Sequence, residues 1–374
     1  MGLEAFALEP QPLALNRMSA NYVPIEVSNS GLGIETQLAS WVIRAVRQGV
    51  NVAHKVDFDL VYATNNNLFN LIAGLWIAKQ LRLPCVAVVH HLRWVDYRQL
   101  GEPEDISKLN PSLYLRSLRD DGLSAAVALT RVMGGYLESK FLPKFDGFIV
   151  VSKTVASQLR TLVQPNRIFV VGNAPFTTRS DLQPVPTGSM TALFVGRVDE
   201  GKGIAELLNA WEKVVADCPL AYLHIVGDGT LRIGMISEAS RRGLGTHLGF
   251  GGFLDDSEVA KLRSQSRFFI TLSRTEGFGM ALAEALAAGL PVIAWDTPPL
   301  REIFGDCPAV FLCNQGNILE IVAASVKLLT ISEDEWRALS NQASNYSHRF
   351  SWAETARNEL RALETVMEES RSNR

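Results

Sequence analysis

The chain has 374 residues, of which 47% are apolar and 20% charged, so it carries enough apolar side chains to build large cores and is not a disordered sequence. The 36 Lys and Arg residues are balanced by 39 Asp and Glu residues, and a net charge of −3 gives no general attraction for a polyanion such as DNA. The length predicts two domains, and no nucleic-acid partner is expected.

The cysteines and the N-terminal segment favour a reducing compartment. The four cysteines are Cys85, Cys218, Cys307 and Cys313, and no two of them have the short spacing of a zinc site. The segment Met1–Met18 lacks the basic start and apolar stretch of a secretory signal. The longest apolar segment, Leu68–Ala78, is interrupted by Asn70 and is far shorter than the roughly 20 residues of a membrane span. We expect a cytoplasmic protein, and the sequence leaves peripheral contact with the inner membrane face open.

The first half of the chain predicts alternating strands and helices. From Asp57 onward, short apolar runs typical of buried strands are separated by segments of helical length. The runs are Leu60–Ala63, Cys85–Val89, Phe148–Val151 and Ile168–Val171. This pattern indicates parallel βαβ units in a doubly wound sheet. The segment Asn173–Ser189 then predicts a linker, because it is rich in Pro, Thr and Ser and has no apolar period.

A second alternation follows the linker. The helices Gly203–Asp217 and Met280–Ala288 separate apolar runs, and the second helix stops at Gly289 with Pro291 just beyond. The runs are Ala192–Val195, Ala221–Val226, Phe268–Leu272 and Pro291–Ala294. The predicted fold class is therefore α/β, with two doubly wound domains.

A Gly-rich turn, Gly196–Gly203, follows the first strand of this second half and leads into a helix. Backbone N–H groups and the helix dipole favour a phosphate at such a junction, and Arg197 and Lys202 add two cations. The turn differs from the phosphate loop of nucleoside triphosphatases, because Gly203 stands where a Ser or Thr would bind Mg²⁺. Taken alone, it would be interpreted as a solvated surface turn.

A second Gly-rich turn, Ser273–Gly279, also lies between a strand and a helix. Glu276 lies in this turn, and Glu284 lies more than one turn into the helix. A carboxylate would repel a phosphate, so we expect both to accept hydrogen bonds from hydroxyl groups of a sugar or a ribose. A pair of glycosidase carboxylates is the alternative, which two phosphate-suited turns make less attractive.

Together these residues resemble the retaining glycosyltransferases of family 4 (glycosyl transferases group 1), which have the GT-B fold. The resemblance covers about Asp57–Glu364. Its most specific element is the pair Glu276 and Glu284 with seven residues between them, followed by Arg197 with Lys202.

The resemblance implies a site for a nucleotide diphosphate sugar in the second half. Arg197 and Lys202 would hold the diphosphate, Glu276 would lie beside the donor sugar, and Glu284 would bind the ribose. The main chain of Phe253–Asp255 falls where the family holds the nucleobase. The expected donor-binding residues are Gly196, Arg197, Lys202, Phe253, Leu254, Glu276, Gly277, Phe278, Gly279, Met280, Ala281 and Glu284. The turn Ile225–Gly229 also resembles a family turn. For this turn, and for Phe253–Asp255 as the alternative to nucleobase binding, the expected role is structural.

The strand end Val88–Leu92 in the first half also matches the family, which places there a His that contacts the donor sugar near the reacting carbon. The match is His90, so the expected catalytic residues are His90, Arg197, Lys202 and Glu276. Glu138 resembles another family position and is interpreted as structural.

We expect no metal and no cofactor beyond the nucleotide sugar itself. Asp57–Asp59 imitates the metal-binding acidic pair of the other large glycosyltransferase fold, but it precedes a strand, whereas a ligand-binding pair should follow one. Arg197, Lys202 and helix termini would supply the positive charge that Mg²⁺ supplies elsewhere.

The start of the chain departs from the family. The family opens with a strand, a Gly-rich loop, a helix and a second strand, and about 30 residues of this unit have no counterpart here. Val23–Ser28, Asn29–Gly33 and Ile34–Gln48 are an alternative strand, loop and helix, but they leave little chain for the second strand. We therefore expect a truncated N-terminal domain. Asn173–Pro175 is a second departure, since the family has Gly after the Asn.

The expected organisation is an acceptor domain over residues 1–178 and a donor domain over 179–350, facing a cleft, followed by a C-terminal helix over 351–374. Trp352 would anchor that helix, which in the family packs back on the first domain. The expected reaction transfers a hexosyl unit, with retention and without metal, to the hydroxyl of a glycan, lipid or small molecule. A non-catalytic nucleotide-sugar-binding relative and a nucleotide-sugar epimerase or hydrolase are the alternatives.

Overall fold

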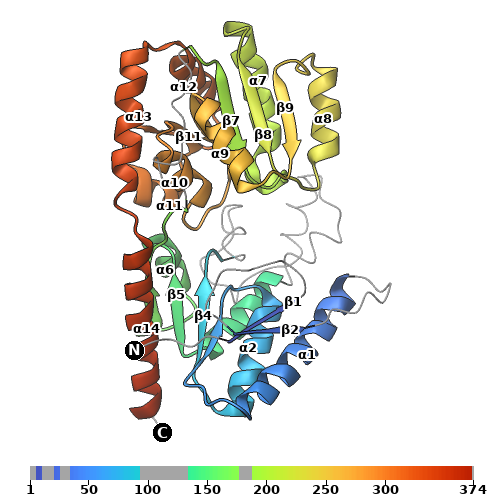
Figure 1. The fold of residues 1–374 in the computed structure, drawn as a ribbon, viewed down its shortest axis with the longest axis vertical. Coiled ribbons are helices and arrows are strands. Elements are labelled where there is room, and N and C mark those ends of the chain that lie inside the picture. Colours follow the sequence, from blue (N-terminus) through green and yellow to red (C-terminus); the bar gives the residue numbers. More distant parts are fainter. Residues whose placement is uncertain (1–5, 11–20, 26–33, 93–133, 177–187, 373–374) are drawn as a thin grey trace. The chain divides into compact units, whose positions relative to one another are not determined.

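The fold of the chain is given by a computed structural model, which describes residues 6–10, 21–25, 34–92, 134–176 and 188–372 (Figure 1). The chain divides into two compact units, each with its own sheet. The first unit contains residues 1–151, 155–171 and 358–374, and the second contains 152–154 and 172–357. We expected divisions at 178/179 and at 350/351. None of the described helices is long and apolar enough to cross a membrane.

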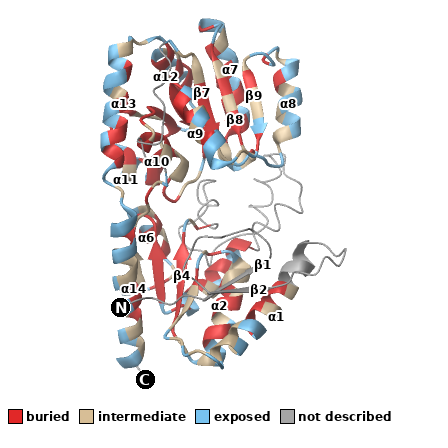
Figure 2. Ribbon diagram, in the orientation of Figure 1, coloured by how far each residue is buried: buried red, intermediate tan, exposed pale blue. Residues whose placement is uncertain are grey.

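The N-terminal unit contains a four-stranded parallel sheet in the order β3-β4-β5-β6. Its strands are β3 (Val61–Ala63), β4 (Cys85–Val89), β5 (Gly147–Val150) and β6 (Ile168–Val170). Its helices before the linker include α1 (Ile34–Ala53), α2 (Leu68–Leu81) and α6 (Lys153–Leu159). Every residue of β4 and β5 is buried (Figure 2), as expected of strands covered on both faces.

The first residues form a separate parallel pair, β1 (Phe6–Pro10) with β2 (Asn21–Ile25). Strand β2 and helix α1 lie where the alternative interpretation of Val23–Gln48 places a strand and a helix, but β2 pairs with β1 and is not part of the four-stranded sheet. The truncation of the N-terminal domain therefore stays a prediction. Residues 54–60, between α1 and β3, contain no strand. The segment between β2 and α1 lies outside the described residues, as does most of the predicted linker.

Helix α14 (Trp352–Ser372) begins in the C-terminal unit and ends in the N-terminal one. At its start, the Trp352 ring stacks on Phe176 with centroids 4.7 Å apart, and its indole N–H donates to the carbonyl of Pro175. From residue 358 onward, apolar side chains of α14 complete a core with β4 and β5, namely Ala362, Leu363 and Val366 against Val86, Val88 and Ile149. Gly147 allows this approach, since a Cβ there would lie 2.4 Å from Val366 Cγ2.

The C-terminal unit contains a six-stranded parallel sheet in the order β12-β11-β10-β7-β8-β9. Its strands are β7 (Thr191–Val195), β8 (Tyr222–Val226), β9 (Leu248–Gly252), β10 (Phe268–Thr271), β11 (Val292–Trp295) and β12 (Val310–Cys313). Its helices are α7 (Ile204–Asp217), α8 (Arg232–Arg241), α9 (Asp256–Gln265), α10 (Met280–Ala287), α11 (Pro298–Phe304), α12 (Ile318–Thr330) and α13 (Glu333–Ser347). The chain runs outward from β7 to β9 and then returns to the other side of β7 at β10. The carboxyl ends of β7 and β10 therefore form the topological switch point, where doubly wound sheets bind their ligands.

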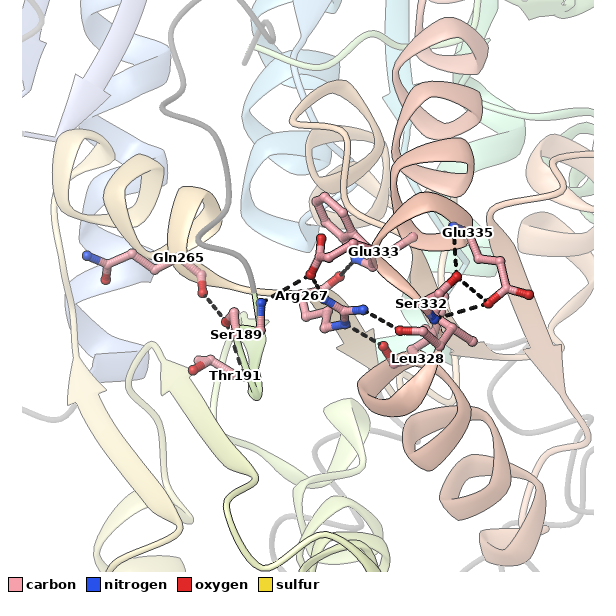
Figure 3. Close-up of polar contacts among 11 residues, drawn as sticks. Ser189, Thr191, Gln265, Arg267, Leu328, Ser332, Glu333 and Glu335 are labelled. Atoms are coloured by element: carbon pink, nitrogen blue, oxygen red, sulfur yellow. Dashed lines mark hydrogen bonds and ion pairs between the residues drawn. The ribbon is translucent and has the colours of Figure 1, made fainter.

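A buried arginine fixes the base of this sheet, at the opposite end from the switch point. Arg267 directly precedes β10, and its guanidinium bonds to the carbonyls of Leu328 and Ile331 and to Glu333 Oε1 (Figure 3). Glu333 also accepts a hydrogen bond from the backbone N–H of Gly188, where the described chain resumes before β7. One side chain thus ties β10 to helices α12 and α13.

Candidate functional site

The two Gly-rich turns predicted from the sequence lie against each other at the switch point. Strands β7 and β10 are parallel neighbours, so residues 196–203 and 272–279 leave the same edge of the sheet. The backbone N–H of Arg274 donates to the carbonyl of Gly201 at 3.0 Å. Gly203 has a φ of 67°, and a Cβ at this position would lie 2.3 Å from the carbonyl oxygen of Leu272. Glycine is thus required for this contact between the two turns.

An ion pair joins the turns. Lys202 Nζ lies 2.6 Å from Glu276 Oε1, and the two side chains are 23% and 18% exposed. A lysine ammonium has three N–H donors, so contact with Glu276 leaves donors for other oxygen atoms. The structure therefore places a cation and a carboxylate together at the edge of the sheet, accessible to solvent.

Arg197 has a different partner from Lys202. Its Nη1 atom lies 3.2 Å from Asp199 Oδ2, and its side chain is 77% exposed. An ion pair this exposed contributes little to stability, so the guanidinium is not fixed by it. The structure brings Lys202 and Glu276 together, while the shared role expected of Arg197 and Lys202 stays a prediction.

Glu284 lies in α10 and forms an ion pair with Arg263 of α9. The carboxylate is 21% exposed, whereas the arginine side chain is 6% exposed. Arg263 is not among the residues predicted for the site, although the sequence carries a signal for it. Arg263 shares one helical face with Val259 and Leu262, and a charged side chain on an apolar face must find a partner.

The start of α10 offers backbone groups rather than side chains. Gly279 caps the helix with a φ of 95°, and the first N–H groups of a helix have no partner within it. Beside it, Phe278 is 6% exposed, and its ring packs edge-on against Phe304 and Phe350. The side chain of Phe278 thus belongs to the core, which leaves its backbone to face a ligand. Gly277 is buried, and Met280 and Ala281 are half-buried.

The turns after β8 and β9 continue the same edge of the sheet. The N–H of Gly196 donates to Val226, and the N–H of Gly227 donates to the carbonyl of Gly252 at 2.7 Å. A Cβ at Gly227 would lie 1.9 Å from the carbonyl oxygen of Gly196, which gives this glycine a structural role. Next to Gly252, Phe253 is 87% exposed and Leu254 is half-buried. An exposed aromatic ring thus stands where the nucleobase is expected.

The N-terminal unit holds His90 at the carboxyl end of β4, where its side chain is exposed. The neighbouring backbone is held by Asn66, whose Nδ2 donates to the carbonyl of His91 at 2.7 Å and also to Glu138. Glu138 is 1% exposed, which fits the structural role expected of it. The catalytic role of His90 stays a prediction.

The acidic pair before β3 makes a local contact. Asp59 forms an exposed ion pair with Arg371 of α14 at 2.8 Å. Within the described ranges, no group of three or more His, Cys, Asp or Glu side chains is arranged to hold a metal ion.

Two family models match the chain, and together they cover both units. The family described as Glycosyltransferase Family 4 matches residues 16–175, and the one described as Glycosyl transferases group 1 matches residues 178–347. The chain belongs to the group 1 glycosyltransferases. Its two parallel-sheet α/β units are those of the GT-B fold, as the sequence predicted.

Named relatives of this glycosyltransferase act on different substrates. A 2-deoxystreptamine N-acetyl-D-glucosaminyltransferase from Niallia circulans is 23% identical over 83% of this chain and 77% of the relative. A phosphatidyl-myo-inositol mannosyltransferase from Mycolicibacterium smegmatis is 34% identical over 54% of this chain, and the match spans about half of that relative (51%).

Solved structures share the fold at low identity. Sucrose-phosphate synthase from Thermosynechococcus elongatus superposes with a TM-score of 0.73 at 20% identity, over 93% of this chain and 84% of that one. Anabaena HepE in complex with UDP and glucose gives a TM-score of 0.64 at 19% identity, over 93% and 86% of the two chains.

Proposed function

We propose that this glycosyltransferase moves a hexosyl unit from a nucleoside diphosphate sugar to an acceptor hydroxyl, with retention of configuration. The observation that carries the proposal is the contact between Lys202 and Glu276 across the switch point. It places a cation suited to a diphosphate within hydrogen-bond reach of an acid suited to a sugar hydroxyl.

Lys202 has the chemistry to assist the departure of the diphosphate. Negative charge develops on the leaving oxygen as the glycosidic bond breaks, and a fixed ammonium beside it lowers the barrier. The N–H groups at the start of α10 act in the same direction, and Arg197 adds a second, exposed cation. With this charge supplied by the chain, the proposed reaction needs no divalent metal and no cofactor.

Glu276 and His90 have the chemistry to act around the sugar. Glu276 accepts hydrogen bonds from donor-sugar hydroxyls, and the role proposed for His90 is a further contact to the sugar near the reacting carbon. The acceptor hydroxyl attacks from the face that the diphosphate leaves, and an oxygen of the leaving phosphate takes its proton. This route retains configuration without an enzyme nucleophile.

The test uses the purified chain with UDP-, GDP- and ADP-linked glucose and mannose. The acceptors follow the relatives' names: phosphatidylinositol, 2-deoxystreptamine and a polyprenyl-diphosphate disaccharide. Mass spectrometry of the products should show one added hexose. Donor consumption without any acceptor would instead indicate an epimerase or hydrolase. Binding without turnover of any combination would indicate a non-catalytic relative, and either result would overturn the proposal.

A further inference from the structure

The ion pair of Arg263 with Glu284 differs from that of Lys202 with Glu276, because its two side chains are exposed to different extents. In the pair of Lys202 with Glu276, both side chains are similarly exposed, at 23% and 18%. In the pair of Arg263 with Glu284, the cation is 6% exposed and the carboxylate 21%. The arginine is thus enclosed in the unit, while the carboxylate remains accessible from outside.

The bond to Arg263 uses one carboxylate oxygen of Glu284. Arg263 Nη2 donates to Oε2, and among the described residues no hydrogen bond reaches Oε1. A carboxylate offers lone pairs on both oxygens, so Oε1 can accept bonds from a ligand while Oε2 stays bound. The pair therefore presents an unused acceptor at a fixed position.

The buried arginine gives Glu284 little freedom to turn away. Breaking the contact would leave a guanidinium charge enclosed without its carboxylate, which is strongly unfavourable. The planar guanidinium also directs its N–H groups, which restricts the carboxylate more than a lysine would. Arg263 lies in the last turn of α9, the helix that follows Phe253 and Leu254, so the same helix connects the expected nucleobase position to Glu284.

We propose that Arg263 is a positioning residue, which fixes Glu284 to accept hydrogen bonds from the ribose hydroxyls of the donor and thereby makes the site prefer ribonucleotides over deoxyribonucleotides. This inference rests on the proposed function, since it requires a nucleotide donor. A site built to bond a hydroxyl rejects the analogue that lacks it, because the acceptor is then left without a partner.

The test measures affinity by calorimetry for UDP, GDP and ADP and for their 2′-deoxy and 3′-deoxy forms, using the full chain. We expect the wild-type protein to bind at least one ribonucleotide about 10-fold or more tightly than a deoxy form, as one hydrogen bond to a charged acceptor allows. R263Q should bring the ratio of the ribonucleotide affinity to the deoxynucleotide affinity close to 1, because it should weaken the binding of the ribonucleotide alone. R263K, which keeps the charge but loses the planar geometry, should give an intermediate ratio.

Two controls separate positioning from stability. R241Q removes an exposed arginine that pairs with Glu238 in α8 and should leave the ratio unchanged. E284A should by itself remove the preference for ribonucleotides. Adding R263Q to E284A should not change the affinities further, because Arg263 acts through Glu284. If R263Q unfolds the unit, R263K carries the comparison.

The outcomes distinguish this inference from the function on which it rests. If the wild-type protein binds none of these nucleotides, the proposed donor class is wrong. If it binds them without preferring ribose, or if R263Q and R263K weaken ribose and deoxyribose forms equally, Arg263 is structural only and the inference is overturned while the donor class stands.

Discussion

Lys202 Nζ lies 2.6 Å from Glu276 Oε1, so the cation of one turn is held by the acid of the next at the junction of β7 and β10. K202A should reduce turnover by about 10²- to 10³-fold, because it removes one charge that stabilises the departing diphosphate. Thermal stability should change little, since a partly exposed ion pair contributes at most about 1 kcal/mol. Initial rates and calorimetric melting measure the two effects. The control is K213A, because Lys213 is an exposed lysine of α7, and it should alter neither turnover nor thermal stability. Unchanged turnover in K202A would contradict the role of Lys202 in the departure of the diphosphate.

Gly203 permits a comparison in which backbone strain is matched. Gly203 and Gly243 both have a positive φ, of 67° and 74°. A Cβ at Gly203 would lie 2.3 Å from the Leu272 carbonyl oxygen, whereas a Cβ at Gly243 would meet no atom within 4 Å. G243A should therefore cost about 1 to 2 kcal/mol, the strain of the left-handed conformation alone. G203A should cost more and should also lower nucleotide affinity, because the two turns must separate. Equal losses in chemical denaturation would show that the close contact is unimportant.

Arg267 donates hydrogen bonds to Leu328 of α12, to Glu333 of α13 and to Ile331 between the two helices. The carbonyl of Arg267 accepts a further bond from the indole of Trp336. R267M should lower the free energy of unfolding by about 2 to 3 kcal/mol, because two carbonyls and one carboxylate lose their donor. The exposed Arg241 gives the comparison, since R241M should cost less than about 1 kcal/mol. Urea titration of both variants measures the difference, and equal costs would show that Arg267 is not a structural centre.

Glu333 should make stability depend on acidic pH. The hydrogen bond from Arg267 holds the pKa of this carboxyl below its ordinary value of 4.5, and the Gly188 N–H acts in the same direction. A carboxyl with a lowered pKa in the folded state contributes stability above its unfolded pKa, and that contribution is lost as the pH falls below about 4.5. Melting temperatures between neutral pH and pH 3 should therefore fall less steeply for E333Q than for the wild-type protein. Parallel curves would exclude this contribution.

The sequence predicted the buried strands well, because their signal is local. Cys85–Val89 is a continuous apolar run, and its predicted bounds coincide with those of β4. Strand β9 was missed because three of its five residues are glycines, and its place in the sheet depends on pairing with β8. At Gly249 a Cβ would lie 2.3 Å from the Tyr222 hydroxyl oxygen, so a larger residue there would have to displace a side chain that is distant in the sequence.

The candidate site was predicted in part for the same reason. The two turns carry their own signals in Gly, Lys and Glu, so their proximity follows once both are placed at the ends of parallel strands. The partner of Glu284 could not be identified in this way, because the charge of Arg263 on an apolar helix face indicates that a partner is needed but not which one. Arg263 lies 21 residues before Glu284, and the packing of the Phe278 ring against Phe304 and Phe350 is likewise not visible in the turn itself. Tertiary packing decides such contacts, and a pattern along one segment does not contain it.

The last helix has a consequence for how this chain is made. Val86, Val88 and Ile149 lie in the N-terminal unit, but the side chains that cover them come from residues 362–366 of α14. During translation these strands leave the ribosome first and must wait for the end of the chain before their core is complete. A nascent or C-terminally shortened protein therefore exposes apolar sheet surface throughout synthesis of the second unit, which makes it a substrate for chaperones and proteases.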